Sequence, residues 1–196
     1  MSPILGIWAS QNYSRVAPDT GAMFPLGMVR VGSGGAANIT FSSIPSTYKH
    51  LQIRGIAQTN RGTYGTDSLY ARFNSDSGTN YADHWIRGNG SVAAAGNYAP
   101  SSNLLYISYG GAGTGVSGVY GASVIDILDY ASTTKYKTTR TFNGTDINGE
   151  IAGSPGFVFL SSGLWMSTSA ISSITITADN GNFNQYSQFA LYGIKG

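Results

Sequence analysis

The side chains best suited to chemistry stand together at Asp83, His84 and Trp85. A histidine beside a carboxylate can act as a general base, and the amphipathic tryptophan ring suits contacts with sugars or with another subunit. Successive side chains of a strand point to opposite faces, so we expect Asp83 and Trp85 on one face and His84 on the other. We therefore assign no catalytic residue here. Asp83 and Trp85 remain candidate glycan or subunit contacts, and an ordinary place on the surface or in the core is the alternative.

An oxygen-rich stretch precedes this triplet and includes Asn74, Asp76, Asn80 and Asp83. Its spacing departs from that of an EF-hand calcium loop, and no closing glutamate follows. An Asx-rich turn is the simpler interpretation, so we expect no metal site.

The other carboxylates do not form a convincing catalytic pair. Asp126 and Asp129 are three residues apart and are expected on opposite faces of one strand, whereas glycoside hydrolysis needs two carboxylates that flank one bond. Glu150 is the only glutamate. The pattern therefore favours a protein that is not an enzyme.

The composition supports that expectation. Among 196 residues there are 2 histidines, no cysteine, and 9 carboxylates against 11 lysines and arginines. Without cysteine there are no disulfides, thiolate nucleophiles or cysteine-based zinc sites. A net charge of +2 is too small to indicate direct nucleic-acid binding, and we expect no cofactor. Charged residues make up only 10% of the chain, so either uncharged polar groups keep the surface soluble or partners cover part of it.

One basic cluster is visible, at Lys135, Lys137 and Arg140. Lys135 and Lys137 have the spacing of side chains on one strand face, where they would meet an acidic partner, a glycan or, as the alternative, only solvent. The 13 tyrosines suit interfaces, although tyrosine is also an ordinary strand residue.

The elements that must position these residues are strands. From residue 36 onward, apolar and polar residues alternate in short runs, and no sustained helical stripe is present. Asn-Gly pairs, which suit tight hairpin turns, occur at Asn89-Gly90, Asn143-Gly144, Asn148-Gly149 and Asn180-Gly181. About eight to ten strands joined by glycine-rich loops predict an all-β fold, an antiparallel β-sandwich of jelly-roll-like type.

The alternation also predicts one shared core. Its members are the residues on the apolar face of each run: Leu51, Ile53, Leu69, Phe73, Ile125, Ile127, Ile174, Ile176, Phe189 and Leu191.

The beginning of the chain differs from the rest, because it is apolar without a period and is followed by Gly32-Ser33-Gly34-Gly35. We therefore expect an extended arm and flexible joint over residues 1–35 and the sandwich over residues 36–196. The arm would anchor a partner through Ile4, Leu5, Ile7, Trp8, Met23, Phe24 and Leu26. The alternative is that this segment packs on its own domain. It has neither the basic flank and length of a signal peptide nor the length of a membrane span.

Several stretches resemble structural proteins of tailed bacteriophages, of the kinds described as head decoration or minor tail components. They are PILGIWAS near the start, ITFSSIPSTYKHLQIRGIA at residues 39–57, and QFALYGIKG at the end, with support from DSLYARFNSDSGTNY and SSGLWMSTSAISSITIT. The resemblance implies a small virion protein with a β-sandwich body and no catalytic residues.

We therefore expect a non-enzymatic structural protein on the exterior surface of a virion. The leading hypothesis is a capsid decoration or cement protein that binds the major capsid protein, forms a homotrimer and contacts no membrane. The alternative is a tail- or fibre-associated module that binds a host-receptor glycan.

Overall fold

The computed structural model describes residues 22–113, 117–151 and 154–196. These residues form strands and loops, with no helix that could span a membrane. The strands are β1 (Met23–Arg30), β2 (Asn38–Phe41), β3 (His50–Thr59), β4 (Thr66–Phe73), β5 (Tyr81–Gly88), β6 (Ala93–Ser102), β7 (Leu105–Ala112), β8 (Gly121–Leu128), β9 (Lys137–Ile151), β10 (Ser154–Trp165), β11 (Ile174–Ala178) and β12 (Gln188–Ile194).

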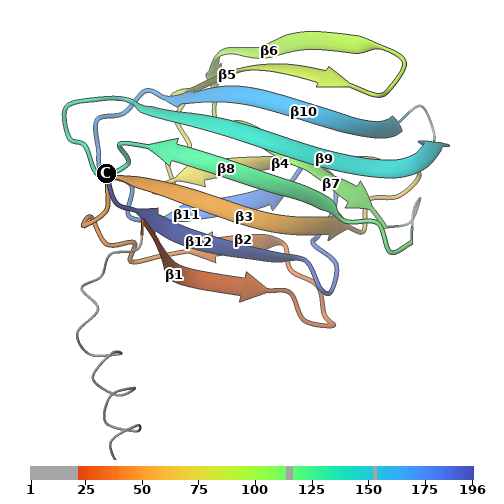
Figure 1. Ribbon diagram of the computed structural model, residues 1–196, viewed down its shortest axis with the longest axis horizontal. Coiled ribbons are helices and arrows are strands. Elements are labelled where there is room, and N and C mark those ends of the chain that lie inside the picture. Colours follow the sequence, from red (N-terminus) through yellow and green to blue (C-terminus); the bar gives the residue numbers. More distant parts are fainter. Residues whose placement is uncertain (1–21, 114–116, 152–153) are drawn as a thin grey trace, which may run out of the picture.

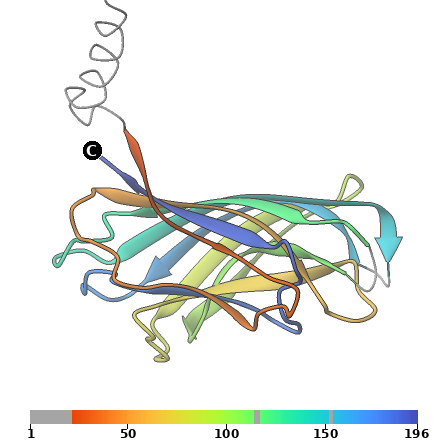
Figure 2. The same cartoon turned by 90° about the horizontal axis from the view of Figure 1, so that it is seen from below.

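The strands form two layers that lie against each other (Figures 1 and 2). The large sheet has the order β1-β12-β3-β8-β9-β10-β5-β6 and is antiparallel throughout. The small sheet has the order β2-β11-β4-β7. The end of β3 crosses from one layer to the other, where Gln58 and Thr59 pair in parallel with Gly111 and Ala112 of β7. This arrangement confirms the predicted all-β, jelly-roll-like antiparallel sandwich.

The predicted core is confirmed. All ten residues named from the alternation are buried, and all belong to one hydrophobic cluster between the two sheets. The strand period of two places every second side chain of β3, β8 and β12 toward the small sheet. A second, aromatic cluster of Tyr106, Tyr109 and Phe159 lies where β7 faces β10.

The predicted turns divide into two kinds. Asn89-Gly90 joins β5 to β6, with Gly90 at a φ of 88° and the Asn89 Oδ1 accepting from the Val92 N–H at 2.7 Å. Asn180-Gly181 lies in the longer loop between β11 and β12. Asn143-Gly144 and Asn148-Gly149 are not turns, because both lie within β9.

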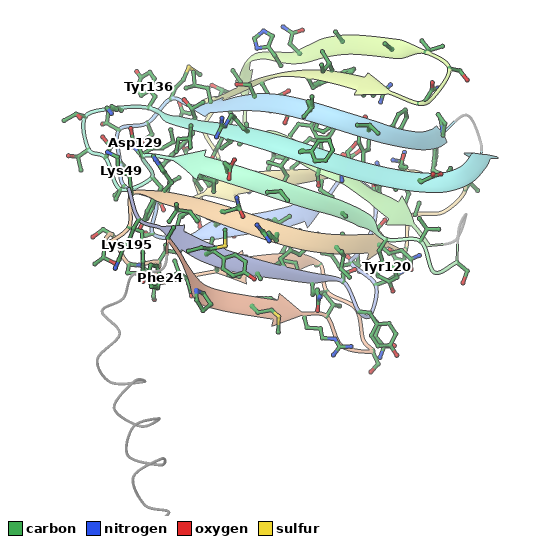
Figure 3. The ribbon with its side chains drawn as sticks, in the orientation of Figure 1. Phe24, Lys49, Tyr120, Asp129, Tyr136 and Lys195 are labelled. Carbon is green, nitrogen blue, oxygen red and sulfur yellow. The ribbon has the colours of Figure 1, made fainter. Side chains whose placement is uncertain are left out.

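The N-terminal boundary also needs correction. Residues 23–30 form β1, which pairs along its length with β12, so the predicted limit of the sandwich at residue 36 is too late. Leu26 packs against the main core, and the ring of Phe24 lies 5.6 Å from that of Tyr48 and under the Lys195 ammonium (Figure 3). This part of the segment therefore packs on its own domain, as the alternative predicted.

The glycine-rich stretch that follows β1 is a closed turn, in which the Gly35 N–H donates to the Gly32 carbonyl at 3.1 Å. The structure thus places a turn where the sequence predicts a flexible joint. The remaining predicted anchors Ile4, Leu5, Ile7 and Trp8 lie outside the described residues. A truncation designed to test an arm must therefore end before Met23.

Candidate assembly surface

The outer face of the large sheet, which points away from the small sheet, displays a row of side chains that crosses all eight strands and is apolar except at Arg54 in β3. Strand register determines the row, because directly paired residues point to the same face. Its members, from β1 to β6, are Met28, Ala190, Arg54, Val124, Phe142, Leu160, Ile86 and Ala95. At the usual separation of neighbouring strands, the row is about 34 Å long.

A second row lies beside the first and is made mostly of small or apolar residues: Arg30, Gln188, Ile56, Ala122, Gly144, Val158, Gly88 and Ala93. We call the two rows together the apolar band. Its large members are open to solvent, with Phe142 56% and Val158 57% exposed. Contiguous apolar patches on a soluble domain mark interaction sites.

Two hollows interrupt the band. One is bordered by Arg54 and the apolar residues Met28, Ile56, Val124, Phe142 and Ala190. The other lies where the alanines of β6 meet larger side chains of the neighbouring strands, and is lined by Ile86, Ala93, Ala95, Val158 and Leu160. Each hollow could receive an apolar side chain from a partner surface.

A polar row lies beside the first row of the band, on the side away from the second row. Its members are Tyr192, Gln52, Asp126, Arg140, Ser162, His84 and Asn97. The Gln52 Nε2 donates to Asp126 Oδ1 at 2.8 Å, and Arg140 lies 3.4 Å from Asp126 Oδ2. The Arg54 Nε in turn donates to Gln52 Oε1 at 2.8 Å. The Arg54 guanidinium is thus held in place by Gln52 of the polar row.

The triplet in β5 follows the predicted alternation. Asp83 and Trp85 share the inner face, and His84 is exposed on the outer face. Asp83 is only 1% exposed and lies 3.5 Å from the backbone N–H of Tyr106. Trp85 packs against the aromatic cluster and under the Arg87 guanidinium. The predicted contact through Asp83 is therefore wrong, because burial removes its carboxylate from any glycan or subunit.

The predicted basic pair is also separated by the structure. Lys135 lies outside β9 and pairs with Asp129 at 2.7 Å. Lys137 is fully buried, and its ammonium donates to the carbonyls of Lys135 and Ser167 at 2.9 and 3.2 Å. Burial lowers the pKa of Lys137. Lys137 therefore supports the fold and does not present its charge to a partner.

The oxygen-rich loop is an Asx-rich turn, as its spacing indicated. Asp76 accepts from the Gly78 N–H at 2.9 Å, from Asn80 Nδ2 at 2.9 Å and from Trp165 Nε1 at 2.7 Å. The Trp165 bond contributes most to lowering the pKa of Asp76. Within the described ranges, no three histidine or acidic residues lie together in a way that could hold a metal ion.

Sequence reasoning missed the apolar band. The signal was present in the second phase of each alternating run, since Ile56, Phe142, Val158 and Ile86 all lie on the face opposite to the buried residues of their strands. A search for apolar residues in both phases would have found the large members. The small members in β6 can be placed only through their register with β5.

Comparisons with known proteins add little. No family model and no curated protein matches the chain. A GH43 glycoside hydrolase whose engineered active site displays both endo-xylanase and exo-arabinofuranosidase activity is similar over 90% of this chain, which spans 37% of that chain, at 13% identity and a TM-score of 0.32. The CBM40 of the Ruminococcus gnavus IT-sialidase, bound to α2,3-sialyllactose, is similar over 85% of this chain and 91% of its own, at 8% identity and a TM-score of 0.32. A chain of the Sacbrood virus of honeybee is similar over 89% of this chain and 86% of its own, at 12% identity and a TM-score of 0.24. Likenesses this weak support no functional argument.

Proposed function

We propose that this chain is a non-enzymatic structural protein of a tailed-bacteriophage virion, and that it decorates the exterior of the capsid. The observation that supports an assembly role is the apolar band. It crosses the whole large sheet while the core is filled separately between the layers, so the band is not needed to close the fold. The assignment to a phage particle comes from the resemblance of the sequence.

In this proposal the band docks on the major capsid protein. A broad, shallow surface suits such a partner, because many copies on one particle gain stability from their neighbours. We further propose a homotrimer whose subunits contact each other through surfaces other than the band. Images of the particle test this symmetry, and isolated single copies would contradict it.

The direct experiment is binding to phage heads made from a genome that lacks this gene. Purified protein is mixed with the heads, the heads are sedimented, and the bound copies are counted on a stained gel. We expect the double variant Phe142→Asp and Leu160→Asp to bind at least about tenfold more weakly, because two buried carboxylates would have to lose their hydration.

Tyr136→Asp is the matched control. Tyr136 is 54% exposed, close to the 56% of Phe142, but lies at the end of the sandwich and away from the band (Figure 3). Equal binding by the double variant and the control would contradict a role for the band. The alternative, a glycan-binding module of the tail, predicts a few dozen copies or fewer per virion, whereas decoration predicts hundreds.

A further inference from the structure

Arg54 is the one charged residue in the first row of the apolar band, which runs from Met28 to Ala95. It lies between Ala190 and Val124 and borders the hollow formed with Ile56 and Phe142. Any surface that covers the band must also cover this guanidinium. Burying an arginine without acceptors is costly, because its charge and its five N–H groups lose water.

The protein itself meets only a small part of this demand. The Arg54 Nε donates to Gln52 Oε1, and this is the hydrogen bond that the Arg54 side chain makes within the described residues. Gln52 is fixed in turn by Asp126, whose second oxygen faces Arg140. The two terminal amino groups of Arg54 thus remain available, on a side chain whose direction is already set.

We propose that Arg54 selects the partner of the band by pairing with a carboxylate that the partner protein presents within an apolar patch. A guanidinium held at its Nε offers its amino groups to a carboxylate as a fork, and this pairing is stronger and more directional than a neutral hydrogen bond. The surrounding apolar residues would exclude water from the pair. This inference rests on the proposed assembly role and names the chemistry of its partner.

Charge disfavours a second copy of this chain as the occupant. The three rows of the outer face contain the guanidiniums of Arg30, Arg54 and Arg140 against the single carboxylate of Asp126, which Gln52 and Arg140 already engage. Two copies packed face to face would bring these excess positive charges together, because an isologous interface pairs a patch with itself. An acidic and apolar partner relieves the same excess.

The test uses the full chain and heads from the phage genome that lacks this gene. Arg54→Gln removes the charge but keeps a polar side chain, Arg54→Lys keeps the charge without the fork, and Arg54→Glu reverses the charge. We expect about 30-fold weaker binding for Arg54→Gln, a smaller loss for Arg54→Lys, and the largest loss for Arg54→Glu. Arg72→Gln is the matched control, since Arg72 lies in β4 of the small sheet, on the face opposite to the buried Ala71 and Phe73 and so away from the band. It should change binding by less than about twofold.

The urea midpoint of each variant should stay at the wild-type value, which separates binding from folding. Wild-type binding by Arg54→Gln would overturn the proposal and leave the assembly role intact, even if Arg54→Glu fails through repulsion. Failure of the folded wild-type chain to bind heads would overturn the assembly role and this inference together. Sedimentation of the protein alone supplies the last outcome: a dimer abolished by Phe142→Asp would make a second copy the occupant and refute an acidic partner.

Discussion

Strands β3 and β9 belong to the same sheet and are separated only by β8, yet they bury opposite kinds of side chain. Strand β3 points Leu51 and Ile53 inward and the polar Gln52 outward. Strand β9 points Thr141 and Asn143 inward and Phe142 outward. The register makes the contrast direct, because Ile53 pairs with Ile125 of β8, which pairs in turn with Thr141.

The difference follows from what lies opposite each strand. The interior of β3 faces the apolar side chains of the small sheet, whereas the interior of β9 meets the backbone of β7. Asn143 donates to the Tyr109 and Ala122 carbonyls, both at 2.9 Å, and accepts from the Tyr109 N–H at 3.2 Å. Thr145 donates to the same Tyr109 carbonyl at 3.2 Å.

The two layers can approach closely here because Gly121 of β8 has no side chain. A Cβ atom added to Gly121 would lie 2.4 Å from the Tyr109 carbonyl oxygen and 2.3 Å from the Thr145 hydroxyl. A gap this narrow admits short polar side chains and excludes phenylalanine or isoleucine. The inward-facing side chains of one sheet are therefore stabilised in two ways, by apolar contact at β3 and by hydrogen bonds to the backbone of other strands at β9.

The largest loss of stability is expected from shortening a buried apolar side chain of β3. Ile53→Ala should lower the free energy of unfolding by about 2–5 kcal/mol, through lost apolar contact and the cavity left behind. Ile56→Ala is the matched control on the same strand, since Ile56 is 37% exposed on the outer face and should cost under about 1 kcal/mol. Urea unfolding of the two variants measures the difference, and equal losses would mean that the two faces of β3 are wrongly assigned.

The hydrogen bonds between the inner face of β9 and neighbouring backbone are tested at Asn143. Asn143→Ala should cost about 2–3 kcal/mol, because the Tyr109 N–H and the Ala122 carbonyl lose their side-chain partner in a buried place. Asn97→Ala, on the exposed outer face of β6, should stay within about 0.5 kcal/mol. If Asn143→Ala unfolds at the wild-type urea concentration, hydrogen bonding does not hold β9 against β7.

The contrast also explains how far the sequence could lead. Alternation identified the buried phase of β3 correctly because its two phases differ in polarity. In β9, threonine fits either face, and the basic residues suggested an exposed strand, so the inward position of Lys137 was missed. The ammonium of Lys137 bonds to the Lys135 and Ser167 carbonyls, and Asn143 and Thr145 bond to the backbone of Tyr109, more than 30 residues away. Pairing with a distant backbone leaves no local pattern in the sequence.

For the candidate surface, alternation predicted which face of its strand a side chain occupies, but it did not predict the apolar band. It placed His84 opposite Asp83 and Trp85, as the structure confirms. It could not show that the outward residues of eight strands align, because that depends on the register of strands far apart in sequence. Individually exposed apolar residues are ordinary, and only their alignment makes Phe142 and Leu160 informative.

A smaller effect is expected on the outer face of β9. Phe142→Ser should change the free energy of unfolding by no more than about 0.5 kcal/mol, since the ring is 56% exposed, while binding to phage heads falls. Phe159→Ser, on the inner face of β10, is the contrasting variant and should destabilise strongly, because Phe159 is fully buried among aromatic rings. Comparable losses of stability would show that the band contributes to the fold.

The smallest effect concerns the turn after β8, which links the starts of the two compared strands. Asp129 lies 3.0 Å from the ammonium of Lys49, just before β3, and 2.7 Å from that of Lys135, just before β9 (Figure 3). His50 also faces it, accepting a hydrogen bond from the Asp129 N–H at 2.9 Å. The bonds from Lys135 and Lys49 lower the pKa of Asp129 from its ordinary 3.8 to about 2.

A carboxyl whose pKa is depressed in the folded state adds stability above its unfolded pKa and loses it as pH falls through the folded pKa. The difference in urea midpoint between wild type and Asp129→Asn should thus be constant above about pH 5, shrink between about pH 5 and pH 2, and disappear below about pH 2. Asparagine is the right replacement because residue 129 has a φ of 48°, which asparagine tolerates. The pairs are exposed, so the difference should be small and should shrink further in high salt. A difference that persists unchanged at pH 2 would show that Asp129 acts through its backbone conformation and that charge does not tie β3 to β9.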